Sequence, residues 1–219
     1  MIAWFLKVYP FLAWAGSLII FSSCLVAGFA YRGKMGERYS IGSHFVSELG
    51  EIGVSRLAWV FNGGLVLGSA LLFLMMPGVG ISLKNVWGYL GSLVGMVASV
   101  GCLFVGLYPM NNIKPHIRAA MVYFRGGLAT IFLFGIAILV QPASSRVVPF
   151  SALIIGGLAF VSYVAFLTLL GRSRDQGEEN NALDTSTMKE RPRFGWMPFL
   201  EWMVVLLTIL WFLVVSSAR

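Results

Sequence analysis

The chain contains little charge. Asp, Glu, Lys and Arg make up 11% of its 219 residues, whereas hydrophobic residues make up 58%. A typical soluble domain is about 25% charged and about 45–50% apolar. A single domain of this length could not hide so many apolar side chains from water. The composition therefore excludes an ordinary soluble protein and favours one embedded in lipid.

The sequence also lacks the motifs of common catalytic and metal centres. Its two cysteines, Cys24 and Cys102, lie inside apolar runs and form no CxxC spacing. We interpret them as small buried hydrophobic residues. No HExxH, GxSxG, Walker or GxGxxG motif occurs. We therefore predict neither a cofactor nor a metal centre.

Basic residues outnumber acidic ones, and the formal net charge is +7. A basic patch interleaved with aromatic residues would indicate nucleic-acid binding. Here the Lys and Arg residues lie mostly in the gaps between apolar runs. This distribution indicates positive-inside topology and attraction to anionic lipids, and it predicts no nucleic-acid partner.

Long apolar runs dominate the chain. A run of about 20 apolar residues spans a bilayer as a helix, whereas a membrane strand needs only about 9–11 residues. The predicted fold class is all-α: a single integral membrane domain, residues 1–219, of six transmembrane helices at about 11–31, 57–76, 86–108, 117–140, 147–170 and 197–216. A hydrophilic loop at 172–196 precedes the last helix, and we interpret it as solvated and mobile.

Six crossings place both termini, the second loop and the fourth loop on one side of the membrane. That side holds four of the 16 Lys and Arg residues, and the other side, with the first, third and fifth loops, holds eleven. The richer side is predicted to be cytoplasmic. We expect a multi-pass protein of the plasma membrane that contacts membrane lipids. A protein partner or a second copy of the chain is a further candidate.

Two pairs of glycines indicate where the helices pack. Gly64 and Gly68 are four residues apart in the second predicted helix, and Gly91 and Gly95 in the third. Small residues at this spacing let helix backbones approach closely in lipid. We predict that these two faces are helix–helix contacts.

The most polar stretch, Ser47–Glu51, stands just before the second predicted helix. Topology places this first loop on the same face as the start of the fourth helix and the start of the sixth. We expect acids, a base and an amide from these three places to form one polar pocket that binds a ligand. The candidate site residues are Ser47, Glu48, Glu51, Arg56, Asn62, His116, Arg125 and Glu201.

Two ionisable candidates lie within the predicted membrane helices. Ionisable residues inside hydrocarbon are costly, and they usually face the bundle interior with a partner. Arg125 lies about two turns into the fourth helix and Glu201 about one turn into the sixth. We therefore predict an ion pair between Arg125 and Glu201, with Glu48 as an alternative partner.

Other interpretations of the same residues stay open. Glu48 and Glu51 could be carboxylates favoured at a helix start by the helix dipole. His116 could bind a loop carbonyl, and Asn62 could form a helix–helix hydrogen bond. His44 lies four residues before Glu48, so on a helix the two could ligate a metal. Drawing Ser47, His116 and Glu48 as a hydrolytic triad gives poor geometry, because Ser47 and Glu48 are adjacent.

Several of these residues also carry a family resemblance. The second to fourth helices resemble the membrane family called domain of unknown function 998, at Ser47-Glu48-Leu49-Gly50, Asn62-Gly63-Gly64-Leu65 with Gly68, Gly101, Gly106-Leu107-Tyr108-Pro109, and His116 with Ala119-Ala120 and Phe124. That resemblance implies fold and topology rather than a reaction.

A more distant similarity is to the Frag/DRAM/Sfk membrane proteins. They have a comparable Ser-acidic-x-Gly loop, a His that opens the fourth helix and an acidic-aromatic pair entering the last helix, which Glu201-Trp202 matches. Their links to lipid-anchor processing, autophagy and membrane-lipid regulation imply lipid head-group recognition. They also imply that the Ser-acidic loop faces outside or the lumen, opposite to the side that the cation count predicts.

Three functions remain open from the sequence. The first is a membrane protein whose polar pocket binds a lipid head group, a small ligand or a partner. The second is an intramembrane lipid-modifying enzyme with Glu48 and His116 as its acid/base pair. The third is a small transporter component. The sequence leaves open whether the protein is an enzyme.

Overall fold

The computed structural model describes residues 2–142, 144, 146–175 and 192–217. These residues contain six long apolar helices and no strand, which confirms the predicted all-α membrane fold. The helices are α1 (Ile2–Ala30), α2 (Ala58–Leu83), α3 (Val86–Leu107), α4 (Ile113–Leu139), α5 (Ala152–Asp175) and α7 (Trp196–Ser217). A short 3₁₀ helix, η1 (Val46–Gly50), lies between α1 and α2.

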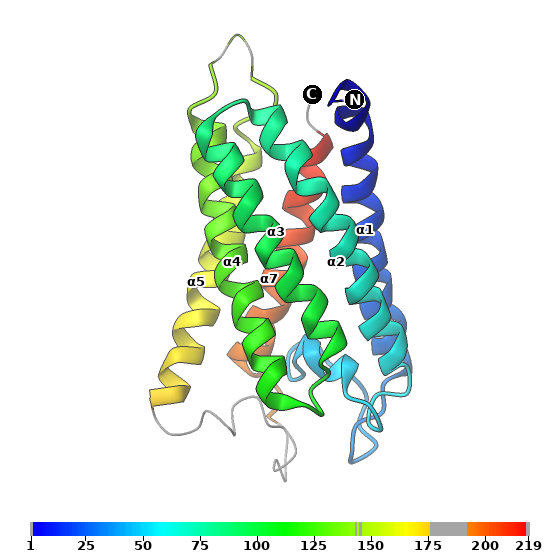
Figure 1. Cartoon of the computed structure of the whole chain (residues 1–219). Helices are drawn as coiled ribbons and strands as arrows, with labels where there is room; N and C mark the ends of the chain where they lie inside the picture. Colours follow the sequence, from blue (N-terminus) through cyan, green and yellow to red (C-terminus); the bar gives the residue numbers. More distant parts are fainter. Residues whose placement is uncertain (1, 143, 145, 176–191, 218–219) are drawn as a thin grey trace.

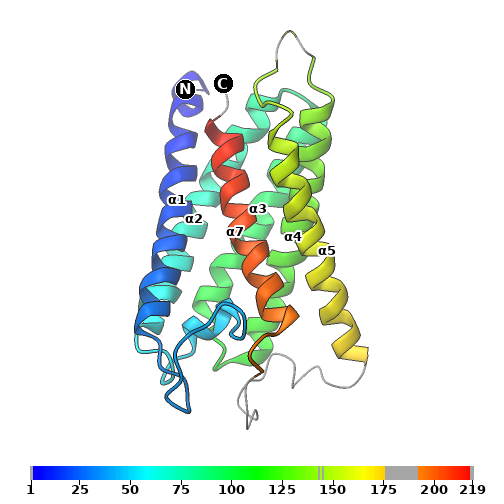
Figure 2. The same cartoon turned by 180° about the vertical axis from the view of Figure 1, so that it is seen from behind.

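The helices form a closed ring. Each of α1 to α4 packs against the next in sequence, α5 packs against α7 and less closely against α4, and α7 returns to α1. Figures 1 and 2 show this ring from its two sides, with both chain ends at one end of the bundle. The segment between α1 and α2, which carries η1, lies at the opposite end with the α3–α4 connection. We call this second end the loop end.

The first two helices, α1 and α2, extend furthest beyond their predicted limits. α1 begins at Ile2 and includes Pro10, and α2 continues through Pro77 to Leu83. Proline removes one backbone hydrogen bond, but packed neighbouring helices and local adjustments compensate for this in membrane helices. Pro77-Gly78 therefore does not end α2.

A side-chain contact, rather than the start of the apolar run, determines where α5 begins. Gln141 Oε1 accepts hydrogen bonds from the backbone N–H groups of Val147 and Val148, at 3.1 and 3.3 Å. These bonds hold the segment in an extended turn, and the helix begins only at Ala152. At its other end α5 runs to Asp175, and residues 176–191 of the predicted mobile loop lie outside the described residues.

The glycine contacts are confirmed. A Cβ on Gly68 would lie 2.8 Å from the Gly16 carbonyl oxygen of α1, and Gly64 faces Ser23 of the same helix. On α3, a Cβ on Gly91 would meet the Phe134 ring of α4 at 2.6 Å. These glycines allow α1 to pack closely against α2, and α3 to pack closely against α4.

The outer surface of the ring suits lipid. Large apolar side chains are exposed along the whole length of the helices, including Leu18, Leu67, Leu93, Ile154 and Leu210. Helices that satisfy their own backbone polar groups and expose apolar side chains are the form that spans a bilayer. The protein is therefore an integral multi-pass membrane protein.

Candidate functional site

The segment that contains η1 is folded into the loop end of the ring. All five residues of η1 are buried, and Glu48 is fully so. Glu48 Oε1 accepts from the Phe45 backbone N–H at 2.9 Å, and Oε2 accepts from the Tyr31 hydroxyl at 3.3 Å. Glu48 therefore holds the turn of its own loop.

Side chains from two helices fix the two ends of η1. The Glu201 carboxylate of α7 accepts from the Val46 N–H at 2.6 Å. The Asn62 amide of α2 donates to the Gly50 carbonyl at 3.0 Å. Because hydrogen bonds in a water-poor interior have few competitors, these two bonds lock η1 against α2 and α7.

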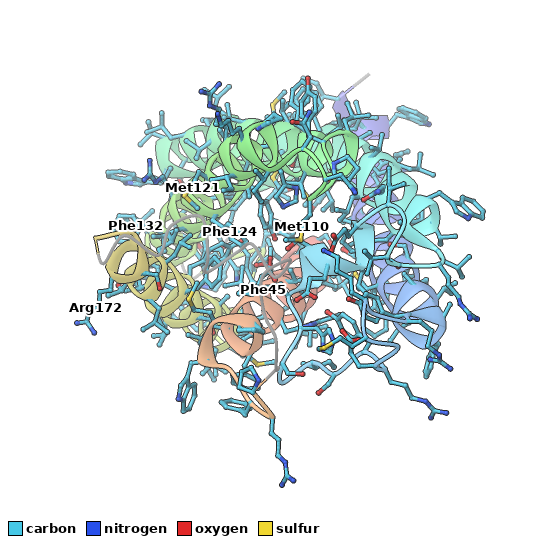
Figure 3. The ribbon with its side chains drawn as sticks, turned by 90° about the horizontal axis from the view of Figure 1, so that it is seen from below. Phe45, Met110, Met121, Phe124, Phe132 and Arg172 are labelled. Carbon is cyan, nitrogen blue, oxygen red and sulfur yellow. The ribbon has the colours of Figure 1, made fainter. Side chains whose placement is uncertain are left out.

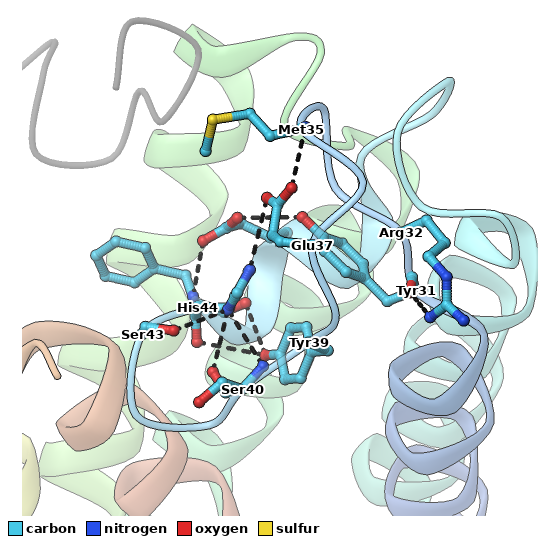
Figure 4. Close-up of polar contacts among 10 residues, drawn as sticks. Tyr31, Arg32, Met35, Glu37, Tyr39, Ser40, Ser43 and His44 are labelled. Atoms are coloured by element: carbon cyan, nitrogen blue, oxygen red, sulfur yellow. Dashed lines mark hydrogen bonds and ion pairs between the residues drawn. The ribbon is translucent and has the colours of Figure 1, made fainter. Parts of the chain in front are cut away.

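An aromatic cluster packs behind η1. The Tyr39 hydroxyl accepts from Trp202 Nε1 at 2.8 Å and donates to the Phe45 carbonyl at 2.9 Å. Its ring lies 5.1 Å from that of His44, and the Nε2 of His44 lies 3.8 Å from the Glu37 carboxylate. Figure 4 shows this network around Tyr31, Tyr39 and His44. Burial, and next the nearby Glu201 carboxylate, raise the pKa of Tyr39, so its hydroxyl remains a donor.

A narrow cavity follows the axis of the ring. It has a volume of about 80 Å³, counted as the space open to the centres of water molecules. Its wall comes from all six long helices and η1, and it is mostly apolar: Phe61, Leu65, Leu72 and Met76 of α2, Val105 of α3, and Val205, Ile209 and Phe212 of α7. Seen from the loop end, Phe45, Met110 and Phe124 lie near the centre of the ring, whereas Arg172 projects outward (Figure 3).

The polar end of this cavity is formed by Ser47, His116 and Glu201. The three residues come from η1, α4 and α7, and each is at least nine-tenths buried. They also line a smaller space of about 20 Å³ that reaches between α4, α5 and α7. The loop, the fourth helix and the last helix thus converge, as the topology argument predicts.

One hydrogen bond decides which His116 nitrogen can meet a ligand. His116 Nδ1 lies 2.7 Å from the Tyr108 carbonyl oxygen, at the turn between α3 and α4. A carbonyl oxygen only accepts, so Nδ1 carries the hydrogen, and Nε2 of the neutral ring is a bare acceptor. Among the described residues no hydrogen bond involves Nε2 of His116, so that atom is available to a ligand.

The polar side chains deeper in the cavity bind within the protein. Thr208 donates to the Tyr163 hydroxyl at 3.2 Å, Ser99 to the Gly95 carbonyl at 2.8 Å, and Thr130 to the Gly126 carbonyl at 2.7 Å. Their hydroxyl hydrogens are therefore already engaged. The rest of the wall below the polar end is mostly apolar, and the hydroxyls of Ser69, Tyr123 and Tyr163 also line it.

A comparison with protein families fits this architecture. A family model described as a protein of unknown function (DUF998) matches residues 14–218. The chain belongs to this family. The match runs from α1 to α7 and confirms the first resemblance, while the similarity to the Frag/DRAM/Sfk proteins stays a prediction. Searches of curated proteins and of solved structures found no match.

Not all of the predicted residues reach the cavity of this DUF998 protein. Arg56 is exposed, and Glu51 pairs with Lys34 at 2.9 Å near the surface. Asn62 and Glu48 are buried but hold the loop, and neither lines the cavity. The acid beside His116 is Glu201, so the structure offers Glu201 rather than Glu48 as the acidic partner of an acid/base pair.

The predicted ion pair between Arg125 and Glu201 was wrong. Arg125 lies on the exposed face of α4, and no ion pair joins it to Glu201 in the part of the chain that the structure describes. The rotation of α4 turns Phe124 and Gly127 inward and Arg125 outward. Glu201 lies beside His116, whereas Arg125 lies nine residues further along α4, about 13 Å along the helix axis. Arg125 therefore differs from the predicted partner in both depth and helix face.

The alternative metal pair, His44 and Glu48, does not form on one helix face. Residues 41–45 are a turn, and His44 Nδ1 contacts Ser40 and Ser43 while Glu48 contacts Phe45 and Tyr31. Within the described residues, no three His, Cys, Asp or Glu side chains are close enough to hold a metal ion.

Sequence analysis missed the apolar length of the cavity and the Tyr39 contact. The lining residues of α2, α3 and α7 resemble any other apolar residues of a membrane helix, so no local signal separates them. Tyr39 stands in a polar loop, and its bond to Trp202 joins residues 163 positions apart. Only the adjacency of Trp202 to Glu201 gave a hint of this contact.

Proposed function

We propose that this protein binds an amphiphilic lipid inside its helix ring. The head group lies beside Ser47, His116 and Glu201, and the hydrocarbon tail lies along the axis. The observation that carries this proposal is one cavity with a polar end and a mostly apolar wall. Ligand sites of this kind combine apolar walls with a few convergent polar groups.

The length of the cavity supports a lipid tail. Glu201 and Phe212 both line it. They are eleven residues apart on α7, which corresponds to about 16 Å at the helical rise of 1.5 Å per residue. The hydrocarbon of one leaflet is about 15 Å deep, half of a bilayer core. A lipid tail from one leaflet therefore matches the cavity wall.

The test is to fill the cavity and examine what co-purifies. Val205→Phe adds a ring to the α7 wall of the cavity. The added ring takes space that a lipid tail would occupy, and overpacking of this kind costs about 1–3 kcal/mol of free energy when both are present. The amount of tightly bound lipid should therefore fall about tenfold. Native mass spectrometry of the purified chain measures it. The matched control is Leu210→Phe on the exposed face of the same helix. Equal amounts of co-purified lipid in Val205→Phe and Leu210→Phe would reject the proposal.

We also propose that the protein lies in the plasma membrane and binds membrane lipids there. Fractionation of cells that express the tagged chain checks the compartment. Recovery mainly in internal membranes would contradict this location without affecting the cavity argument.

A second candidate is a lipid-modifying enzyme. It is favoured by the fixed orientation of His116, whose Nδ1–H is held by the Tyr108 carbonyl so that Nε2 can take a proton. Glu201 replaces Glu48 as the acidic partner. Incubating the protein with radiolabelled membrane lipids would reveal a product that His116→Asn abolishes. Identical lipid profiles with and without protein would leave binding as the function.

A further inference from the structure

The head-group end of the cavity presents hydrogen-bond acceptors and no cation. Its ionisable acid is Glu201, and no Lys or Arg lines the described cavity wall. Arg125, the cation nearest in sequence to the cavity-lining part of α4, is exposed on the outside of the ring. An anionic head group would therefore lie beside a buried acid with no cation to balance its charge.

From this arrangement we propose that the cavity selects single-chain amphiphiles whose head group donates hydrogen bonds and carries no negative charge. Long-chain amines and long-chain alcohols are two members of this class. Fatty acids and phosphate-bearing lipids fall outside it. This inference rests on the proposed lipid-binding function and names its ligand class.

The first argument is the acceptor capacity of Glu201. The carboxylate has two oxygens with about four lone-pair sites. The Val46 N–H, at 2.6 Å, uses one of them. A buried carboxylate gains most from a charged donor, because charge-assisted hydrogen bonds are about twice as strong as neutral ones. An ammonium head group supplies that donor and the missing positive charge together.

The second argument is the orientation of His116. Its Nδ1–H is engaged with the Tyr108 carbonyl, so the ring nitrogen offered to a ligand is the acceptor Nε2. A hydroxyl or an amine can donate to it. A carboxylate or a phosphate dianion cannot, and its oxygens would face the Nε2 lone pair. Ser47 can donate or accept, so it accommodates either head group without deciding between them.

The third argument concerns the tail. Only about 80 Å³ of the cavity can hold the centre of a water molecule. A space this narrow admits one hydrocarbon chain, and a two-chain lipid would have to push the packed helices apart. The small space toward α5 is about 20 Å³, too small for a second tail.

The test compares three probes with the same saturated chain: hexadecylamine, hexadecanol and palmitate. The full chain is purified, depleted of lipid and offered each probe at the same mole fraction in detergent micelles. Retention is measured by native mass spectrometry. We expect the amine and the alcohol to be retained at least about tenfold more than palmitate, which corresponds to 1.4 kcal/mol.

Two variants examine the head-group contacts. Glu201→Gln keeps an oxygen that can accept from Val46. It should reduce the preference for amine over palmitate from about tenfold to less than about threefold, because glutamine cannot form a charge-assisted hydrogen bond with the ammonium group. His116→Asn keeps a donor for the Tyr108 carbonyl but removes the Nε2 acceptor, and it should weaken binding of the alcohol. Val205→Phe should reduce retention of all three probes.

The outcomes separate the two proposals. Palmitate retained as well as the amine, or an amine preference unchanged in Glu201→Gln, overturns the ligand class while lipid binding stands. Equal retention of every probe in the original chain and in Val205→Phe overturns lipid binding in the cavity itself. Apparent melting temperatures of each variant identify any that fails to fold, and His116→Asn then carries the head-group test alone.

Discussion

At the scale of single residues, the buried polar residues of the loop end form two groups that differ in what their side chains contact. Ser47, His116 and Glu201 face the cavity, and Glu201 also accepts from the Val46 N–H, whereas Glu48 and Asn62 hold η1 without lining the cavity. The two groups would look alike in any list of buried polar residues. A substitution in the second group should therefore reduce stability without changing which ligand is preferred.

Glu48→Gln provides this test. Each Glu48 oxygen accepts from a different donor, the Phe45 N–H and the Tyr31 hydroxyl. Glutamine offers one oxygen and an NH₂ group, so the Phe45 N–H keeps its acceptor and the Tyr31 hydroxyl has to turn to accept instead of donating, with neutral hydrogen bonds in place of those to a carboxyl group. We expect a loss of about 1–3 kcal/mol in unfolding free energy, measured by titration with a denaturing detergent, and an unchanged order of probe binding.

The control for this substitution is Glu51→Gln. Glu51 pairs with the half-exposed Lys34 near the surface. Pairs of this kind contribute about 0–1 kcal/mol. A stability loss in Glu51→Gln equal to that in Glu48→Gln would mean that the buried bonds of Glu48 are not what stabilises the loop.

At the scale of helices, small residues set the spacing of the ring. The α1–α2 contact brings the Gly16 and Gly68 backbones together, and a Cβ on either would lie 2.8 Å from the carbonyl of the other. Apolar side chains alone do not hold helices together in lipid, because lipid tails are equally apolar. Close backbone packing supplies this part of the stability.

Gly68→Val should therefore separate α1 from α2. We expect a loss of about 1–3 kcal/mol from overpacking, seen as a lower apparent melting temperature in detergent. Gly63→Ala is the matched control in the same helix, because a Cβ there meets nothing within 4 Å. Replacing glycine by alanine in a helix should be neutral or stabilising by about 0.5–1 kcal/mol. A lower apparent melting temperature for Gly63→Ala than for Gly68→Val would contradict this packing.

At the scale of the whole molecule, the ring has two distinct ends. The chain termini lie at one end, and the segment with η1 lies at the other with the α3–α4 connection (Figure 1). The polar end of the cavity, formed by Ser47, His116 and Glu201, lies at the loop end, so the proposed head-group site lies toward one membrane face. Which face this is decides which leaflet supplies the ligand.

Cysteine labelling in intact cells tests the two ends. In a chain with Cys24 and Cys102 replaced by Ala, Met35→Cys marks the loop end and Ser144→Cys marks the opposite end; both positions are exposed. The excess of Lys and Arg at the loop end predicts that a membrane-impermeant thiol reagent labels only Ser144→Cys. Labelling of Met35→Cys alone would place the loop outside, and labelling of both would contradict the two-ended ring.

The sequence by itself determined the six membrane helices, and it placed three of the polar connections on one face. Both follow from properties of consecutive residues: the length of each apolar run, and the parity of the crossings. The η1 residues, His116 and Glu201 could therefore be assigned to the same end before any coordinates were known. The glycine contacts were also predictable, because four-residue spacing is local information.

Only the tertiary structure decided which side chains face inward. α1 and α2 are apolar all round, so no polar stripe in the sequence fixes their rotation about their own axes. Arg125 and Phe124 are neighbours in sequence, yet packing turns one to the outside and the other to the cavity. The difference in role between Glu48, which holds the loop, and Glu201, which lines the cavity, has the same origin. The fold of the loop and the rotation of α7 are set by contacts between distant residues.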